Sequence, residues 1–172
     1  MTRGGANTPL AYIGARAVHV EARLAELGIT LPPPGEPKAN YNMTCLDGHT
    51  LYVSGHLPIT IDDGIICGRC GEGHLTKDEG YVAARWAGLN LISTLKRELG
   101  DLDRVDKVVK LFGIVNSTED FVEQHLVMNG CSDLIMEVFG GDVGYHARSA
   151  IGTSALPLGI AVEVEGIVRI KP

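Results

Sequence analysis

Arg148 is the residue of this chain whose neighbours in the sequence best suit a binding site for an anion. It follows Ala147 and precedes Ser149 in the stretch HARSAIG, so its immediate neighbours are small. A planar guanidinium in such surroundings can donate two parallel hydrogen bonds to one carboxylate. An exposed arginine paired with a nearby acid would give the same sequence, and exposed arginines are the commoner case. Residue type and spacing leave both interpretations of Arg148 open.

Glu163 and Glu165 are a second set of residues with a possible chemical role. They are two positions apart in the strand-like run IAVEVEGIV. On a strand they share one face, with about 7 Å between their Cα atoms. Paired carboxylates can divide the work of holding a proton and positioning a water molecule. The solvent-facing side of an antiparallel strand has the same pattern, and the pair alone favours that simpler interpretation.

The cysteines and nearby histidines offer a third kind of chemistry, a metal or redox site. Cys67 and Cys70 form a C-x-x-C motif followed by His74, and Cys45 and His49 lie upstream. Such a set could bind zinc tetrahedrally, and a C-x-x-C can also be a redox pair. The sequence has no second C-x-x-C, and this one lies in a glycine-rich stretch rather than in a βαβ unit. We therefore favour incidental thiols and expect no metal site.

No other motif in the sequence indicates a known catalytic class. His56, His125 and His146 have no acid or nucleophile at a spacing typical of catalysis. A serine nucleophile elbow, a phosphate-binding loop and a dinucleotide-binding fingerprint are all absent from the sequence.

Composition and charge limit the classes of protein to which this chain can belong. The chain has 172 residues, 45% of them hydrophobic, and a formal net charge of -6. These values fit one globular domain and argue against nucleic acid as the main partner. No apolar run approaches the roughly 18 residues that a membrane span needs. Four cysteines without an export signal predict a cytoplasmic protein with reduced thiols. Mitochondria are the alternative, because the first 20 residues carry Arg3 and Arg16 but no acid.

The chain divides into an arm, a helical extension and a main domain. Residues 1–16 are predicted to form an irregular arm. Residues 17–40 are predicted to form a helix that ends at Gly28, followed by a proline-rich connector. Residues 41–172 form the main domain.

Two predicted strands open the main domain. Residues 41–46 and 50–59 have strand composition and are joined by Asp47-Gly48, which is typical of a hairpin turn. A third strand is predicted to include Ile65 and Ile66.

Helices and strands then alternate. Thr76 and Glu79 fit a capping box that begins a long helix, which Gly100 ends. Residues 105–115 have strand composition. A second helix is predicted around Cys131, Leu134, Ile135 and Val138, ending at Gly140-Gly141, and it precedes two final strands within ARSAIGTSA and IAVEVEGIVRI.

This order predicts an α+β fold in which both helices cover one face of a mixed sheet. On the last strand one face carries Val162, Val164, Val168 and Ile170, and the other carries Glu163, Glu165, Ile167 and Arg169. The helices can cover only one of these faces. The second is left for solvent or for another copy of the chain, so we expect an oligomer.

Three stretches resemble the Rid (reactive intermediate deaminase) family, also labelled endoribonuclease L-PSP-like. They are YVSGHLPI, LGDLDRVDKVVKLFGIVNS and HARSAIGTSALPLGIAVEVEGIV, and the resemblance extends from Tyr41 to the C-terminus. The helix ARLAELGITLPPP resembles a longer subgroup of the family. The resemblance implies a chorismate-mutase-like α+β fold of the bacillary type. It also implies a homotrimer whose sheets line a central barrel, with active sites between subunits.

The activity that the resemblance implies is hydrolysis of reactive enamines and imines, such as 2-aminoacrylate, to 2-keto acids and ammonia. It implies no metal or organic cofactor. Arg148 matches the arginine that binds the substrate carboxylate. Glu163 matches the residue that holds the attacking water, and Tyr41 matches the pocket tyrosine.

Other positions match less closely. Gly55 matches the glycine of the family's SG pair, where a missing side chain lets the backbone approach the ligand. Asn129 and Ala150 correspond to further substrate-binding positions, Ala150 through its backbone. His56 replaces the family's usual glutamine, and Asn42 replaces a serine.

Three alternative functions stay open on the sequence alone. A non-catalytic module of the same fold would bind a small carboxylate metabolite. A ribonuclease, which one family label suggests, is disfavoured by the acidic balance and the lack of a histidine pair. A zinc or redox protein would depend on the thiols.

Overall fold

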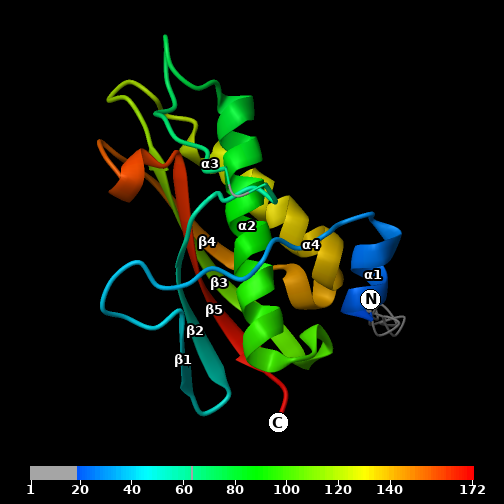
Figure 1. Cartoon of the computed structure of the whole chain (residues 1–172). Coiled ribbons are helices and arrows are strands. Elements are labelled where there is room, and N and C mark those ends of the chain that lie inside the picture. Colours follow the sequence, from blue (N-terminus) through cyan, green and yellow to red (C-terminus); the bar gives the residue numbers. More distant parts are fainter. Residues whose placement is uncertain (1–18, 63) are drawn as a thin grey trace, which may run out of the picture.

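A mixed five-stranded sheet, covered on one side by helices, forms the body of the molecule. The computed structural model describes residues 19–62 and 64–172. Its elements in chain order are α1 (Val20–Glu26), β1 (Thr44–Asp47), β2 (Thr50–His56), α2 (Lys77–Leu99), β3 (Val105–Asn116), α3 (Gln124–Val127), α4 (Asn129–Gly144), β4 (Ala147–Thr153) and β5 (Val162–Ile170). The strand order is β1-β2-β5-β3-β4, in which β3 and β4 are parallel and the other neighbours antiparallel (Figure 1). The predicted α+β class is confirmed.

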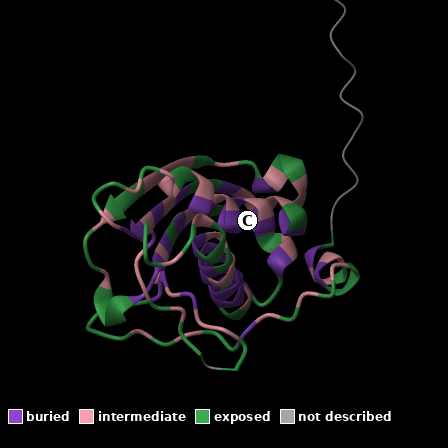
Figure 2. Cartoon of the chain, turned by 90° about the horizontal axis from the view of Figure 1, so that it is seen from above, coloured by how far each residue is buried: buried purple, intermediate pink, exposed green. Residues whose placement is uncertain are grey.

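The two faces of the sheet have different partners. Along β5 the buried residues Val162, Val164 and Val168 alternate with Glu163 and Glu165, as predicted. The valines face α2 and α4, and buried residues gather between these helices and the sheet (Figure 2). We call the other side, which carries the glutamates, the open face. None of the helices among the described residues is long and apolar enough to cross a membrane.

Glycines allow α2 and α4 to pack at short range. A Cβ added at Gly88 of α2 would lie 3.0 Å from Cys131 Sγ of α4. At Gly130 of α4 a Cβ would lie only 2.0 Å from the carbonyl oxygen of Tyr81. The first turn of α4 is therefore pressed against the backbone of α2, which fixes the position of the residues in that turn.

The N-terminal extension begins with α1, which lies beside α4, and its connector then crosses α2 (Figure 1). Glu21 of α1 forms an ion pair with Lys96 of α2. In the connector, the Pro32 carbonyl oxygen accepts a hydrogen bond of 2.6 Å from Ser93 Oγ. These contacts hold the connector against the main domain as it leads to Tyr41.

Several local predictions are confirmed. Thr76 and Glu79 form the capping box of α2, with the Thr76 hydroxyl accepting from the Glu79 N–H at 3.2 Å. Gly28 and Gly100 end their helices with φ of 64° and 72°, in the left-handed region that favours glycine. The arm of residues 1–16 lies outside the described residues.

Other local predictions are wrong. The hairpin strands are shorter than expected, since β1 begins at Thr44 and β2 ends at His56. Ile65 and Ile66 form no strand, because Ile65 makes an isolated bridge to Ile59 and Ile66 bonds to loop segments on either side. At Gly140 a φ of 76° and ψ of 168° interrupt α4, but the helix resumes and extends to Gly144.

Candidate functional site

Arg148 lies on β4, an edge strand, and its side chain faces α3 and α4. Its Nη1 donates to Asn129 Oδ1 at 3.0 Å and to Ser132 Oγ at 2.8 Å. Its Nη2 donates to the carbonyl oxygen of His125 at 2.8 Å. All three acceptors are neutral, and within the described part of the chain no carboxylate pairs with Arg148. This environment does not fit the interpretation of Arg148 as a surface ion pair.

The Arg148 guanidinium keeps two donors unused. Nε and one hydrogen of Nη2 have no partner among residues 19–62 and 64–172. Two free donors of one guanidinium can bind the oxygens of a carboxylate. Beside the guanidinium is an open hollow of about 330 Å³, lined by Ser132, Met136, Tyr145, His146 and Arg148. The arrangement can hold an anion and admit it from outside.

Small residues of the sheet place the start of α4 over Arg148. A Cβ added at Gly113 of β3 would lie 2.1 Å from Met128 Sδ, so the lack of a side chain there admits Met128, the residue before Asn129. Gly113 is paired with Ala150 in the register of β3 and β4. Ala150 is two residues from Arg148, packs against the core and lies on the same side of the sheet. Asn129 and Ala150 are therefore both brought close to Arg148.

Glu163 and Gly55 lie together on the open face. Between two successive pairs of facing residues, β2 has one residue more than β5. The extra residue makes a bulge in β2 that includes Gly55. A Cβ added at Gly55 would lie 1.8 Å from Glu163 Oε1, so only glycine leaves room for the carboxylate. Burial, and then the charge of Glu165, raise the pKa of Glu163. A carboxyl whose pKa is raised is a better proton acceptor than an ordinary glutamate once it is ionised.

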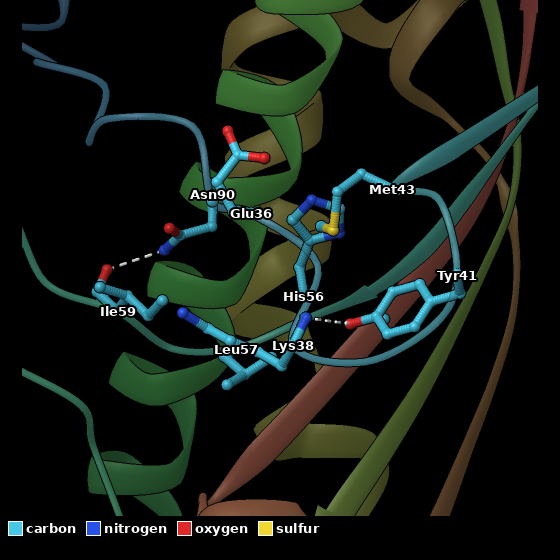
Figure 3. A pocket seen from close by; sticks show the side chains of 10 residues that line it. Glu36, Lys38, Tyr41, Met43, His56, Leu57, Ile59 and Asn90 are labelled. Carbon is cyan, nitrogen blue, oxygen red and sulfur yellow. Dashed lines mark hydrogen bonds between the residues drawn. The ribbon is translucent and has the colours of Figure 1, made fainter.

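Tyr41 lies beside Gly55 at a small cavity between the connector and α2. The cavity has a volume of about 20 Å³, room for about one water molecule. Its walls are formed by Gly35, Glu36, Lys38, Tyr41, Met43, Gly55, His56, Leu57, Ile59 and Asn90 (Figure 3). The Tyr41 hydroxyl accepts from the backbone N–H of Lys38 at 3.4 Å. The extension thus contributes directly to the surroundings of Tyr41.

The predicted site residues form two groups. Asn129 and Ala150 lie with Arg148 on the helix side of the sheet, at the β4 edge. Glu163 and Gly55 lie on the open face at β5 and β2, and β3 separates β5 from β4. A single chain therefore does not bring Arg148 and Glu163 to one ligand.

His56 is a core residue. It is 2% exposed; its Nδ1 lies 2.7 Å from the Ser54 carbonyl oxygen, and its Nε2 lies 2.8 Å from Thr94 Oγ1. Burial lowers the pKa of His56 to about 4, so the ring is neutral at physiological pH. Its ring is engaged inside the protein, unlike a side chain that reaches toward a ligand.

The cysteines do not form the zinc set suggested by the sequence. In the described part of the chain, the one group of three potential ligands within 4.8 Å of one another is Glu21, Asp101 and Asp103. Cys67 is exposed and Cys70 is buried, and both are free thiols. Burial raises the pKa of Cys70 to about 11, which keeps this thiol protonated and unreactive.

Ser132 and His146 are residues near Arg148 that the sequence reasoning missed. Ser132 is three positions after Asn129, and His146 is two positions before Arg148. The first spacing places Asn129 and Ser132 on one side of α4, whereas His146 lies just before β4 begins. The sequence pattern alone could not show that these residues meet Arg148, because that depends on how α4 is placed beside β4.

Comparison with known proteins identifies the family. Residues 21–165 match the family model described as "YjgF/chorismate_mutase-like, putative endoribonuclease". Protein TCP17 of Trypanosoma cruzi is 48% identical over 152 residues, which cover 88% of this chain and 94% of that protein. The chain belongs to the YjgF family, also called Rid or endoribonuclease L-PSP-like, and the resemblance found in the sequence is confirmed.

Solved structures agree with the fold. The Agrobacterium tumefaciens protein Atu1372, of unknown function, is 41% identical with a TM-score of 0.79, covering 89% of this chain and 94% of that one. A "putative endoribonuclease" from Shewanella oneidensis is 30% identical with a TM-score of 0.84, covering 89% of this chain and 100% of that one. The chorismate-mutase-like α+β fold is thereby established for this chain.

Proposed function

We propose that this protein hydrolyses reactive enamines and imines of the 2-aminoacrylate type to 2-keto acids and ammonia. The observation that carries the proposal is that Arg148 keeps two donors free among the described residues and borders the hollow beside it. A 2-imino acid carries its carboxylate next to the carbon that water must attack. A guanidinium that holds this carboxylate also fixes the position of the reacting carbon.

The reaction requires little from the protein beyond orienting the substrate and the attacking water. The imine carbon is already electrophilic, so no metal or organic cofactor is needed. Glu163, as a carboxylate, accepts a proton from water while the oxygen bonds to carbon and the C=N pair moves to nitrogen, which then takes that proton from Glu163. In the resulting carbinolamine Glu163 moves the hydroxyl proton to the amine, so the C–N bond breaks, ammonia leaves and the C=O bond of the keto acid forms. Tyr41 and Gly55 line the Glu163 side of this site.

A complete site on this proposal needs two copies of the chain. Arg148 and Glu163 lie on opposite faces of one sheet, so each copy contributes one group to a cleft shared with a neighbour. The open face also carries apolar side chains, among them Tyr52 and Ile151, each 46% exposed. Burying such a face against other copies is favourable. We propose a cytoplasmic homotrimer with sites between subunits.

Arg148→Lys tests the proposal. Lysine keeps the charge but loses the fork of donors, so release of pyruvate from 2-aminoacrylate generated in situ should fall to the uncatalysed rate. Arg23→Ala is the control, because Arg23 is a surface arginine paired with Glu26 at 3.3 Å. Light scattering checks that the oligomer is intact. Full turnover by an intact Arg148→Lys oligomer would remove the proposal.

The main alternative is a binding module that holds a 2-keto acid without turnover. Its support is that His56, which replaces the family's glutamine, is engaged in the core rather than free for a ligand. Calorimetry separates the two, since pyruvate binding without any acceleration of 2-aminoacrylate hydrolysis favours the module. RNA cleavage, which the names of relatives mention, is tested with purified RNA and the Arg148→Lys variant.

A further inference from the structure

The small cavity beside Tyr41 is enclosed by three parts of the chain that are distant in the sequence (Figure 3). The connector contributes Gly35, Glu36 and Lys38, and α2 contributes Asn90. The remaining wall comes from the segment that leads into β1 and from the end of β2. The N-terminal extension therefore closes a space that the main domain alone would leave open.

The cavity suits a short apolar group. Its surface is mostly apolar, and Met43, Leu57 and Ile59 are among the residues that line it. Its volume of about 20 Å³ has room for about one water molecule, which is close to the size of a methyl group. Water in such surroundings finds few hydrogen-bonding partners, so its replacement by a methyl group is favourable.

Hydrogen bonds to α2 fix the walls of the cavity. Arg97 Nη1 of α2 donates to the Gly35 carbonyl oxygen at 3.0 Å and to Glu36 Oε1 at 3.2 Å. Asn90 Nδ2 donates to the carbonyl oxygen of Ile59 at 2.7 Å. The connector and the segment after β2 are both held to the same helix. The cavity therefore cannot widen for a larger group unless these bonds break.

His56 makes the β2 side of the cavity equally rigid. Its ring is buried, and its two nitrogens are engaged by the Ser54 carbonyl oxygen and the Thr94 hydroxyl. A ring held at both nitrogens cannot turn aside for a ligand. The histidine that replaces the family's usual glutamine thus forms a fixed wall of this cavity.

The cavity adjoins the group that we propose as the base. A Cβ added at Gly55 would lie 1.8 Å from Glu163 Oε1, so the carboxylate lies against the backbone of Gly55. Gly55 also lines the cavity, and Tyr41 lines it beside Gly55. In a 2-imino acid the side chain is bonded directly to the carbon that water attacks. A substrate whose reacting carbon lies at Glu163 therefore has its side chain within reach of the cavity.

We propose that this cavity is the subsite for the substrate's side chain, and that the connector limits the substrates to 2-imino acids with a methyl or ethyl side chain. Leu57 and the connector residues Gly35 and Glu36 determine this specificity. The inference rests on the proposed function and names its substrate class. Longer or aromatic side chains are excluded because the walls are tied to α2.

A series of imines that differ only in chain length tests the size limit. An amino-acid oxidase generates them in situ from alanine, 2-aminobutyrate, norvaline and norleucine, and release of the keto acid is followed. In the unaltered protein kcat/KM should be similar for methyl and ethyl, and should then fall about tenfold or more with each further methylene.

Two variants test the walls, with the ratio of kcat/KM between butyl and methyl as the readout. Leu57→Ala enlarges the cavity and should raise this ratio about tenfold or more. Arg97→Ala releases the connector and should raise it as well. Leu46→Ala is the matched control, because Leu46 is 57% exposed in the hairpin and does not line the cavity, and it should leave the ratio unchanged.

Two outcomes overturn the inference. One is equal kcat/KM for the methyl and butyl imines in the unaltered protein, a measurement that needs no variant to fold. The other is an unchanged ratio in a folded, oligomeric Leu57→Ala protein. Both leave the deaminase proposal standing, because it depends on Arg148→Lys and on turnover of 2-aminoacrylate. Absence of turnover with every imine would instead remove the proposed function, and this inference with it.

Discussion

At Gly55 a single methyl group decides whether Glu163 can keep its place. A Cβ there would lie 1.8 Å from Glu163 Oε1, and the end of that side chain can move away. Gly55→Ala should therefore fold normally while turnover of 2-aminoacrylate falls about 100-fold, the cost of displacing a catalytic group by roughly 1 Å. Gly141→Ala is the control, because a Cβ at Gly141 meets nothing within 4 Å. Equal turnover of the two variants would show that Glu163 has no role in the reaction.

His56 should make the stability of the protein depend on pH. Its pKa is about 4 in the fold, against 6.5 for the free side chain. Between these values the unfolded chain binds a proton that the folded chain does not, so stability is full above 6.5 and is lost as the pH falls toward 4. The loss should reach about 3 kcal/mol. Urea unfolding at about pH 7 and 4.5 should show a smaller loss in His56→Gln than in the unaltered protein.

At the scale of helices and strands, the sequence correctly predicts the features that depend on residues close together in the chain. The capping box of Thr76 and Glu79 and the alternation along β5 depend on spacing within one segment, and both are confirmed. Ile65 and Ile66 have the composition of a strand, but their backbone partners lie in loops that no local pattern reveals. Gly140 has the positive φ expected of a helix end, yet the chain resumes the helix beyond it, where the Tyr145 N–H donates to the Gly141 carbonyl oxygen at 3.1 Å.

The crossing of α2 and α4 should be the least tolerant contact between elements. A Cβ at Gly130 would lie 2.0 Å from the Tyr81 carbonyl oxygen, and backbone cannot yield as a side-chain end does. Gly130→Ala should lower the free energy of unfolding by about 2 to 3 kcal/mol, the usual cost of overpacking. Chemical denaturation measures it. Gly141→Ala lies in the same helix and should change stability little, so an equal loss in both variants would contradict the role of the crossing.

At the scale of the whole molecule, the site could be predicted only in part, because Arg148 and Glu163 lie on opposite faces of one sheet. The types of Arg148 and Glu163 suggested an anchor and a base, and the alternation of β5 placed Glu163 on the uncovered face. The sequence could not show that Arg148 faces the other way, because that depends on where α3 and α4 lie on the sheet. Ser132 and His146 were missed for the same reason. When the residues of a site come from distant elements, or from separate copies of the chain, they have no regular spacing in the sequence by which the site could be recognised.

Complementation between two inactive variants tests whether the site is shared. Arg148→Lys lacks the anchor and Glu163→Gln lacks the base, so each oligomer alone should be inactive. If the groups come from different copies, random mixing by co-refolding gives about a quarter of the contacts both an intact Arg148 and an intact Glu163. Turnover should then recover to about a quarter of the unaltered level. A site within one chain predicts no recovery at any mixing ratio, because every chain in the mixture lacks one of the two groups.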